Sequence, residues 1–230
     1  MEYQQLIEDT FRSSIEHIET ALTACRSPLA GAIRKAISLV EKGGTLFFAG
    51  NGGSAADASH AASELIGSFE HYTAPIPALA LTTDTAIITS IANDLSFDHV
   101  FLQQVRVLVK PGDQLWVIST SGHSMNLFYA AAWAREQKIS TVGLLGRRGG
   151  RILNQVDYPI VIPGDNTQRI QEVHILILHT LASALKRKFP EGVNLPTESI
   201  ASEAPETTET SKESDKKPLK PPDGELDKKK

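Results

Sequence analysis

Two pairs of polar side chains, on two predicted helices far apart in the sequence, have the residue types and spacing of a chemical site. His60 and Glu64 are four residues apart, so they share one face of a helix. Gln171 and His179 are eight residues apart in an apolar helix and, with about 80° of rotation between them, project to broadly one side. Polar groups in an apolar stripe need partners, which these four side chains provide for one another if the helices meet. Imidazole, carboxylate and amide groups together suit zinc or a general acid and base, whereas a surface contact and a core histidine are the alternatives.

A glycine-rich loop lies just before the first of these helices. Residues 50–54, GNGGS, follow the apolar run 45–49, and a helical pattern then extends to Gly67. Glycines let backbone N–H groups approach an anion, Ser54 adds a hydroxyl, and the helix N-terminus adds partial positive charge. The loop is neither the dinucleotide-binding fingerprint nor the lysine-bearing phosphate loop, and a tight turn without a ligand is the alternative.

A second loop of small hydroxyl residues, STSGHS at 119–124, follows another apolar run. The two loops together offer a phosphate many donors without a lysine, although some of these hydroxyls are expected only to cap a helix. The candidate donors are the backbone N–H groups of Asn51, Gly52 and Gly53 and the hydroxyls of Ser54, Ser119, Thr120, Ser121 and Ser124. Without a fixed cation, such a site suits a small sugar phosphate better than a nucleoside triphosphate.

Apolar runs and helical patterns alternate along the chain. The apolar runs predict five strands, at 45–49, 77–82, 115–118, 140–145 and 158–162. Helices are predicted at 55–67, 83–92, 97–109, 125–137 and 167–189, and Asn93 and Asp94 are expected to separate the second of these from the third. An N-terminal pair of helices is predicted at 3–24 and 28–42, divided at Ser27 and Pro28. The alternation predicts an α/β fold, a doubly wound, five-stranded parallel sheet flanked by helices. Ligands of such sheets bind beyond the carboxyl ends of the strands, where both loops lie.

Composition divides the 230 residues near Pro190. Residues 1–189 hold the aromatic side chains and suffice for one domain, whereas 190–230 are charged and proline-containing and are expected to be a disordered tail, either solubilising or partner-binding. The net charge of −4 implies no general affinity for nucleic acid. The single Cys25, the absence of an apolar signal segment and the absence of a membrane-length apolar run indicate a soluble cytoplasmic protein.

Four separated motifs resemble one family. They are GNGGSAADASHAASELIGSF, TTDTAIITSIANDLSF, STSGHS and RIQEVHILILHTL, and the similarity runs from about residue 5 to 188. Together they resemble the sugar-isomerase (SIS) domain and, within it, the sedoheptulose-7-phosphate isomerases, also called phosphoheptose isomerases. The resemblance implies a cytoplasmic homotetramer with active sites between subunits. It also implies conversion of sedoheptulose 7-phosphate to D-glycero-D-manno-heptose 7-phosphate, a step toward the lipopolysaccharide core.

The resemblance also assigns roles to residues. It implies one zinc ion per subunit, held by His60, Glu64, Gln171 and His179. Substrate contacts are implied for Asn51, Gly52, Gly53, Ser54, Glu64, Asn93, Asp94, Ser119, Thr120, Ser121, Ser124 and Gln171. We expect an enediol mechanism with Glu64 as base and His179 as its acid partner. One residue cannot easily be both a tight ligand and a free base, and the sequence leaves that division open.

Two departures from the family pattern bear on the substrate. Ser68 stands where the family often has arginine, and Gln168 stands where some members have aspartate. These residues keep open an isomerase for another sugar phosphate. A further alternative is a non-catalytic SIS adaptor, a tetramer that binds the bacterial replication initiator. Such adaptors lack part of the four-residue cluster, whereas this chain has all of it, which favours the isomerase.

Overall fold

The computed structural model describes residues 2–67 and 75–193, which lie in one compact unit, Met1–Leu195. Ser68 and the part of the predicted tail from residue 194 onward lie outside the described residues. Among the described helices, none is long and apolar enough to cross a lipid bilayer.

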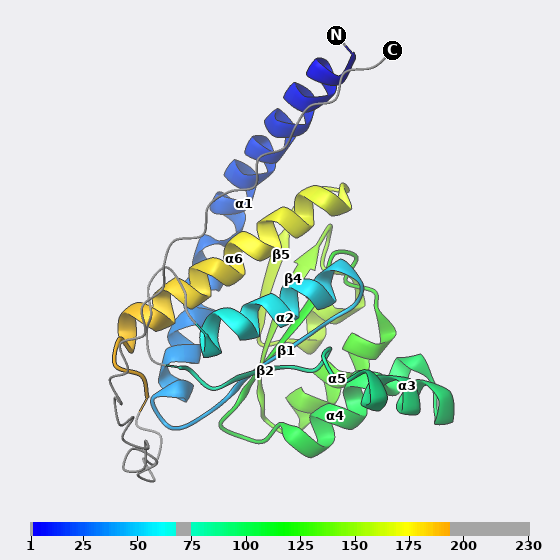
Figure 1. The fold of residues 1–230 in the computed structure, drawn as a ribbon, viewed down its shortest axis with the longest axis vertical. Coiled ribbons are helices and arrows are strands. Elements are labelled where there is room, and N and C mark those ends of the chain that lie inside the picture. Colours follow the sequence, from blue (N-terminus) through cyan, green and yellow to red (C-terminus); the bar gives the residue numbers. More distant parts are fainter. Residues whose placement is uncertain (1, 68–74, 194–230) are drawn as a thin grey trace, which may run out of the picture. The chain divides into compact units, whose positions relative to one another are not determined.

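A parallel sheet of five strands forms the centre of the described unit, in the order β2-β1-β3-β4-β5 (Figure 1). The strands are β1 (Leu46–Gly50), β2 (Ala78–Ala80), β3 (Gln114–Ser119), β4 (Ser140–Gly146) and β5 (Tyr158–Ile162). Strands β1, β3 and β4 are buried along their whole length, as expected for parallel strands covered on both faces. The chain adds β2 on one side of β1 and β3 on the other, so the predicted doubly wound sheet is confirmed.

Helices cover both faces of the sheet. They are α1 (Glu2–Val40), α2 (Gly53–Ile66), α3 (Thr85–Asp94), α4 (Val100–Leu108), α5 (Met125–Glu136) and α6 (Thr167–Lys188), with 3₁₀ turns η1 (Phe97–His99) and η2 (Gly150–Gln155). One core joins α1, α2 and α6 to the sheet, and a second core joins α4, α5 and η2 to the other face. Neighbouring strand residues point to opposite faces, so Phe48 lies in the first core and Phe47 in the second.

The predicted N-terminal helix pair is wrong, because α1 is one continuous helix with Pro28 inside it. Proline removes a helical hydrogen bond and usually breaks a helix. Here a buried stripe runs past Pro28 without interruption, with Ala21 and Cys25 before it and Ala32 and Ala36 after it. Packing of this stripe against the first core holds the helix together across the proline.

Two smaller expectations also need correction. Asn93 and Asp94 do not break a helix, because they form the last turn of α3. The single helix predicted at 97–109 is divided into η1 and α4, and η2 was not expected because its glycine-rich segment has no helical periodicity.

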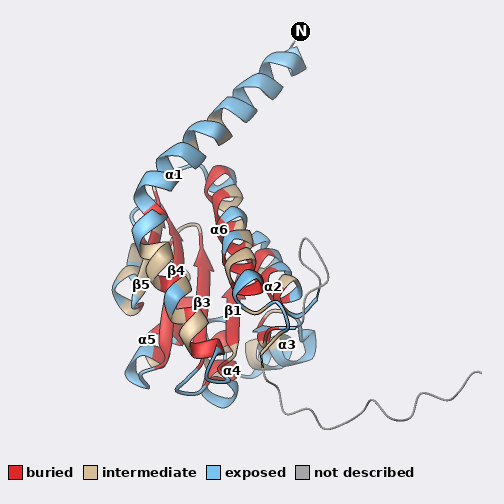
Figure 2. Cartoon of the chain, turned by 90° about the vertical axis from the view of Figure 1, so that its left-hand side faces the viewer, coloured by how far each residue is buried: buried red, intermediate tan, exposed pale blue. Residues whose placement is uncertain are grey.

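The first half of α1 makes few contacts with the rest of the described unit (Figure 2). Its buried positions begin at Ala21, and apolar side chains before that point are exposed, including Phe11 at 68%. It is fastened to α6 at one place, where Ser14 Oγ donates to Glu172 Oε2 (2.7 Å) and Arg169 Nη1 donates to the Thr10 carbonyl (2.7 Å). Glu172, beside Gln171, therefore faces α1 and not α2.

Candidate active site

Helices α2 and α6 lie side by side and run in the same direction. At one end, the Gln171 side chain covers Gly53 so closely that a Cβ on Gly53 would lie 2.4 Å from Gln171 Nε2. At the other end, Lys186 Nζ donates to the Gly67 carbonyl (2.9 Å). Burial lowers the pKa of Lys186, and the charge of Glu64 partly offsets that shift. The two helices that carry the predicted cluster therefore meet along their length.

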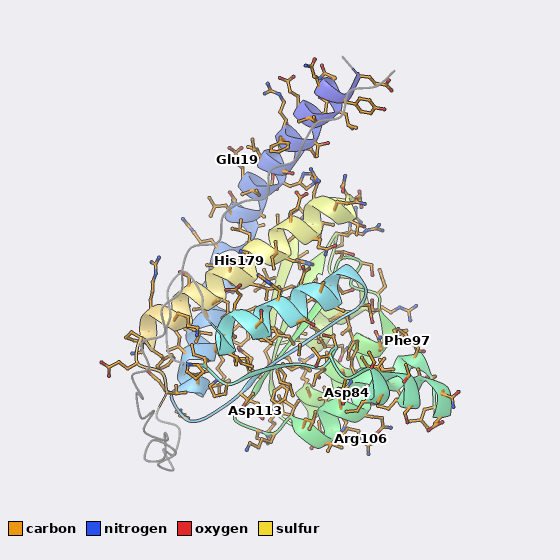
Figure 3. All side chains as sticks on the ribbon, in the orientation of Figure 1. Glu19, Asp84, Phe97, Arg106, Asp113 and His179 are labelled. Carbon is orange, nitrogen blue, oxygen red and sulfur yellow. The ribbon has the colours of Figure 1, made fainter. Side chains whose placement is uncertain are left out.

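The middle of this contact brings three members of the predicted cluster together. His60 Nε2 lies 3.0 Å from His179 Nε2 and 3.3 Å from Glu64 Oε1. Figure 3 labels His179 on α6 where that helix passes α2. Two imidazoles and a carboxylate thus converge from sequence positions more than 100 apart, as |i−j| is 119 for the histidine pair. The predicted meeting of these side chains is what the structure shows.

The donor set fits a zinc ion in its chemistry and in part in its geometry. Ligand atoms about 2.05 Å from a tetrahedral zinc lie roughly 3.3 Å from one another. The 3.0 and 3.3 Å separations around His60 Nε2 are close to that edge length. However, no group of three or more His, Cys, Asp or Glu side chains in the described part of the chain closes around one point. Small side-chain rotations and the Gln171 amide would be needed to complete the coordination.

Asp57 is a buried member of this site that the sequence reasoning missed. It precedes His60 by one helical turn and is 7% exposed. Burial raises the pKa of Asp57, while a hydrogen bond from the Gln171 side chain and the charge of His60 act in the opposite direction. Its Oδ2 atom has no hydrogen-bond partner within the described residues. The signal was present in the sequence, because an aspartate three residues before His60 shares its helix face.

Both predicted phosphate loops lie at the carboxyl edge of the sheet, on either side of the point where the winding changes direction. The first follows β1 and the second follows β3, and β1 and β3 are neighbours. Asn51 and Asn126 hold the loops close by a reciprocal pair of amide hydrogen bonds, each 2.9 Å. Ligands of open α/β sheets bind at this position, so the fold places the loops where a phosphate would be held.

The hydroxyls of the second loop are arranged to donate outward. Ser119 Oγ accepts from the Gly122 N–H (3.0 Å) and Ser121 Oγ accepts from the His123 N–H (3.2 Å). Each hydroxyl can then donate its own proton, and Ser119 and Ser124 share one such bond. Ser124 begins α5 but makes no capping bond with its side chain; its Oγ lies 3.3 Å from Ser119 Oγ. The side chain of Ser124 therefore does not cap α5, and the bonds of Ser119 and Ser121 lie within the loop itself.

Asn93 and Asp94 are the predicted site residues that the single chain does not bring to the cluster. Both are exposed at the end of α3, and Asn93 Nδ2 donates to Asp94 Oδ1 (2.8 Å). Helix α3 has no buried residue and lies away from α2 and α6 (Figure 1). Their predicted contact with substrate stays a prediction. Because α3 lies away from the cluster of its own chain, these residues would have to reach substrate in the site of another subunit.

A doubly wound parallel sheet with a glycine-rich loop and a hydroxyl-rich loop at its switch point, next to a histidine–carboxylate cluster, defines an α/β protein with a candidate small-molecule site at the carboxyl edge of its sheet. The SIS domain family model matches residues 9–146. The chain therefore belongs to the SIS-domain family.

Particular relatives narrow this further. A phosphoheptose isomerase of Aromatoleum aromaticum is 46% identical over 181 residues, which cover 77% of this chain and 89% of the relative. The solved phosphoheptose isomerase of Neisseria gonorrhoeae matches with a TM-score of 0.76 and 38% identity, covering 80% of this chain and 99% of the other. The solved phosphoheptose isomerase of Francisella tularensis matches with a TM-score of 0.78 and 35% identity, covering 81% of this chain and 100% of the other. The predicted resemblance to phosphoheptose isomerases is confirmed.

Proposed function

We propose that this chain is an aldose–ketose isomerase that converts sedoheptulose 7-phosphate to D-glycero-D-manno-heptose 7-phosphate. The observation that carries the proposal is the convergence of His60, Glu64 and His179 beside a phosphate loop, at contacts of 3.0 and 3.3 Å. The same helix, α2, begins at the glycine loop and carries His60 and Glu64. The similarity to phosphoheptose isomerases over more than three quarters of the chain supports the substrate.

The proposed reaction moves one proton between neighbouring carbons. The loops at 50–54 and 119–124 hold the phosphate through N–H and O–H donors, which fixes the other end of the sugar near α2 and α6. Glu64 accepts the proton from C1, next to the C2 carbonyl, and an enediol forms. His179 donates a proton to C2, and transfer of the hydroxyl proton from O1 to O2 completes the aldose. Glu64 then releases the proton that it took and His179 regains one, so both return to their starting states.

We further propose one zinc ion per subunit, for which His60, Glu64, Gln171 and His179 are the candidate ligands; a residue that acts as free base or acid is not at the same time a tight ligand. When bound, it would supply Lewis-acid stabilisation of negative charge on the sugar oxygens. The contact of His60 with both Glu64 and His179 supports this assignment, as does the chemistry of the donor set. Asp57, which holds the Gln171 amide, acts here as a positioning residue.

The proposal includes a cytoplasmic homotetramer that works toward the lipopolysaccharide core. The exposed stripe on α1 supports an oligomer, because large apolar side chains recur at helical spacing: Leu6 (60% exposed), Phe11 (68%), Ile15 (56%) and Leu22 (67%). A groove of about 360 Å³ between α1 and α6 continues this surface. Burial of these faces against other subunits would remove them from water.

A direct test is turnover of sedoheptulose 7-phosphate by Glu64→Gln. Loss of a general base typically costs 10²- to 10⁴-fold, so we expect kcat to fall by roughly that factor. The matched control is Glu136→Gln, an exposed glutamate at the end of α5, which should keep its rate. Light scattering should show both variants in the same oligomeric state as the parent protein.

Near-normal turnover by Glu64→Gln would end the catalytic assignment. The adaptor alternative makes a different prediction, which is that the parent protein itself shows no turnover with or without added zinc. Turnover of another sugar phosphate at a higher kcat/KM would keep the isomerase but replace the substrate.

A further inference from the structure

A hollow beside the second phosphate loop carries unmatched positive charge. It has a volume of about 650 Å³, within the range of roughly 300 to 1,000 Å³ that small-molecule sites occupy. The side chains around it are Ser121, His123, Arg147, Arg148, Arg151 and Asp165. Three guanidinium groups against one carboxylate give it a formal charge of +2, in a chain whose net charge is −4.

The arginines of this hollow are not occupied by acidic partners. Arg147, Arg148 and Arg151 are exposed, and none of them forms an ion pair within residues 2–67 and 75–193. Arg151 Nη1 donates to Met125 Sδ at 3.5 Å, a contact that leaves its charge unpaired among the described residues. Guanidinium groups bind phosphate through paired N–H donors. A phosphate monoester carries a charge of about −1.5 to −2 at neutral pH, which complements the hollow.

The backbone that carries these arginines is locked to the phosphate loop. A Cβ on Gly150 would lie 2.4 Å from the Gly122 carbonyl oxygen, so only glycine allows the two turns to approach this closely. The Ile152 N–H donates to the same Gly122 carbonyl at 3.1 Å. Arg147 has φ 59°, a left-handed conformation that costs a non-glycine residue about 1 kcal/mol or more. Strain of this kind recurs where a turn holds a ligand.

We propose that this hollow is a second anion site, which binds the phosphate group of a phosphorylated small molecule beside the substrate's own phosphate loop. Ser121 borders both places, because it belongs to the loop at 119–124 and also lines the hollow. The site goes beyond the isomerase proposal, since it needs neither the α2–α6 cluster nor turnover. One chain then holds one phosphate in the loop and one in the hollow.

The number of phosphates bound per chain tests this site. Radiolabelled inorganic phosphate is dialysed to equilibrium against the full chain and against the triple variant Arg147→Gln, Arg148→Gln, Arg151→Gln. The matched control replaces three exposed arginines on α1, α4 and α6, and so has the same net charge: Arg34→Gln, Arg106→Gln and Arg187→Gln. Arg106 lies on α4, at the lower edge of Figure 3. We expect the hollow variant to bind one phosphate fewer than the parent chain, and the control to bind the same number.

Several results would overturn the proposal. Equal phosphate on the parent chain and the hollow variant means that the hollow binds none. An equal loss in the control variant means that net charge, and not a site, attracts the anion. In a Ser54→Ala, Ser124→Ala background, the difference of one phosphate must persist; its disappearance would show that the hollow is only part of the loop's site.

Failure of the isomerase proposal looks different in the same assay. A protein without turnover that still loses one phosphate in the hollow variant retains the second anion site. Should the triple variant not fold, Arg148→Gln alone serves, and its phosphate dissociation constant for the hollow should rise at least about threefold. A change of less than about 1.5-fold there contradicts the proposal.

Discussion

Replacement of Gly53 by alanine should lower catalytic activity while leaving the free energy of unfolding nearly unchanged. The added Cβ would lie 2.4 Å from Nε2 and 2.6 Å from Oε1 of Gln171, whereas ordinary contact begins at 3.4 Å. The Gln171 amide must therefore move by about 1 Å. Gly53 has no positive φ and begins α2, so its backbone accepts alanine without strain. The atoms that must yield are the end of a flexible side chain, which keeps the cost in folding free energy small.

The expected outcome is a folded protein with little activity. A displacement of about 1 Å at a reacting group can cost on the order of 100-fold in rate, so kcat/KM for sedoheptulose 7-phosphate should fall by about that factor. The free energy of unfolding, from urea titration, should stay within about 1 kcal/mol of the parent value. Gly52→Ala is the contrasting variant. Its φ of 55° and ψ of −123° form a conformation that favours glycine, and no atom is within 4 Å, so the free energy of unfolding should fall by about 1 to 3 kcal/mol without displacement of Gln171.

A double-mutant cycle decides whether Gln171 carries the effect. In a Gln171→Ala background the added Cβ has no amide to displace, so Gly53→Ala should change kcat/KM by less than about threefold. Independent, additive losses would refute the reasoning. So would a Gly53→Ala protein that keeps more than a third of the parent kcat/KM.

Three further predictions concern stability and assembly. Burial lowers the pKa of His174 to about 4 from its usual 6.5, so its contribution to stability is complete above pH 6.5 and is lost as the pH falls toward 4. Between pH 7 and 4.5 the free energy of unfolding should fall by about 2.5 kcal/mol for this reason, and urea titrations of His174→Gln should lack that fall. Pro28→Ala restores a hydrogen bond inside α1 and should raise the free energy of unfolding by up to about 3 kcal/mol; no change in thermal unfolding would argue that the helix is broken there. Phe11→Asp should lower the mass found by light scattering, because it places a charge on the exposed stripe, whereas Arg12→Asp, the exposed neighbour, should leave the mass unchanged.

The strands and the polar cluster were predictable because their signals are local. The strand Tyr158–Ile162 was predicted with its observed bounds, and β1 was displaced by one residue. Parallel strands buried on both faces are short, nearly continuous apolar runs, and such runs stand out in a sequence. The cluster was predictable for a related reason: His60, Gln171 and His179 are polar groups that interrupt otherwise apolar or alanine-rich helices, and such groups find partners where two helices meet.

The errors arose where a local rule did not decide the outcome. Pro28 is a correct local signal for a helix boundary, but the stripe from Ala21 to Ala36 packs against the sheet and keeps the helix continuous. Asn93 and Asp94 are poor helix formers that nonetheless complete the last turn of α3, whose start is fixed by the Asp84 cap on the Ile87 N–H (2.9 Å). The continuity of α1 depends on packing against distant residues, so local propensity could not reveal it, whereas α3, which has no buried residue, shows only that the ranking of helix formers is a weak guide to where a helix ends.

The alignment of α2 with α6 is the feature on which the site depends and which no local signal encodes. Helical spacing shows that His60 and Glu64 share a face, and that Gln171 and His179 share another, but it does not fix how far one helix slides along the other. The missing Cβ of Gly53 fixes it at one end, because it admits the Gln171 amide. The bond from Lys186 to the Gly67 carbonyl fixes it at the other end. With both ends held, His179 lies opposite His60, and Gly53, near the end of the glycine-rich loop, helps to set the position of His179.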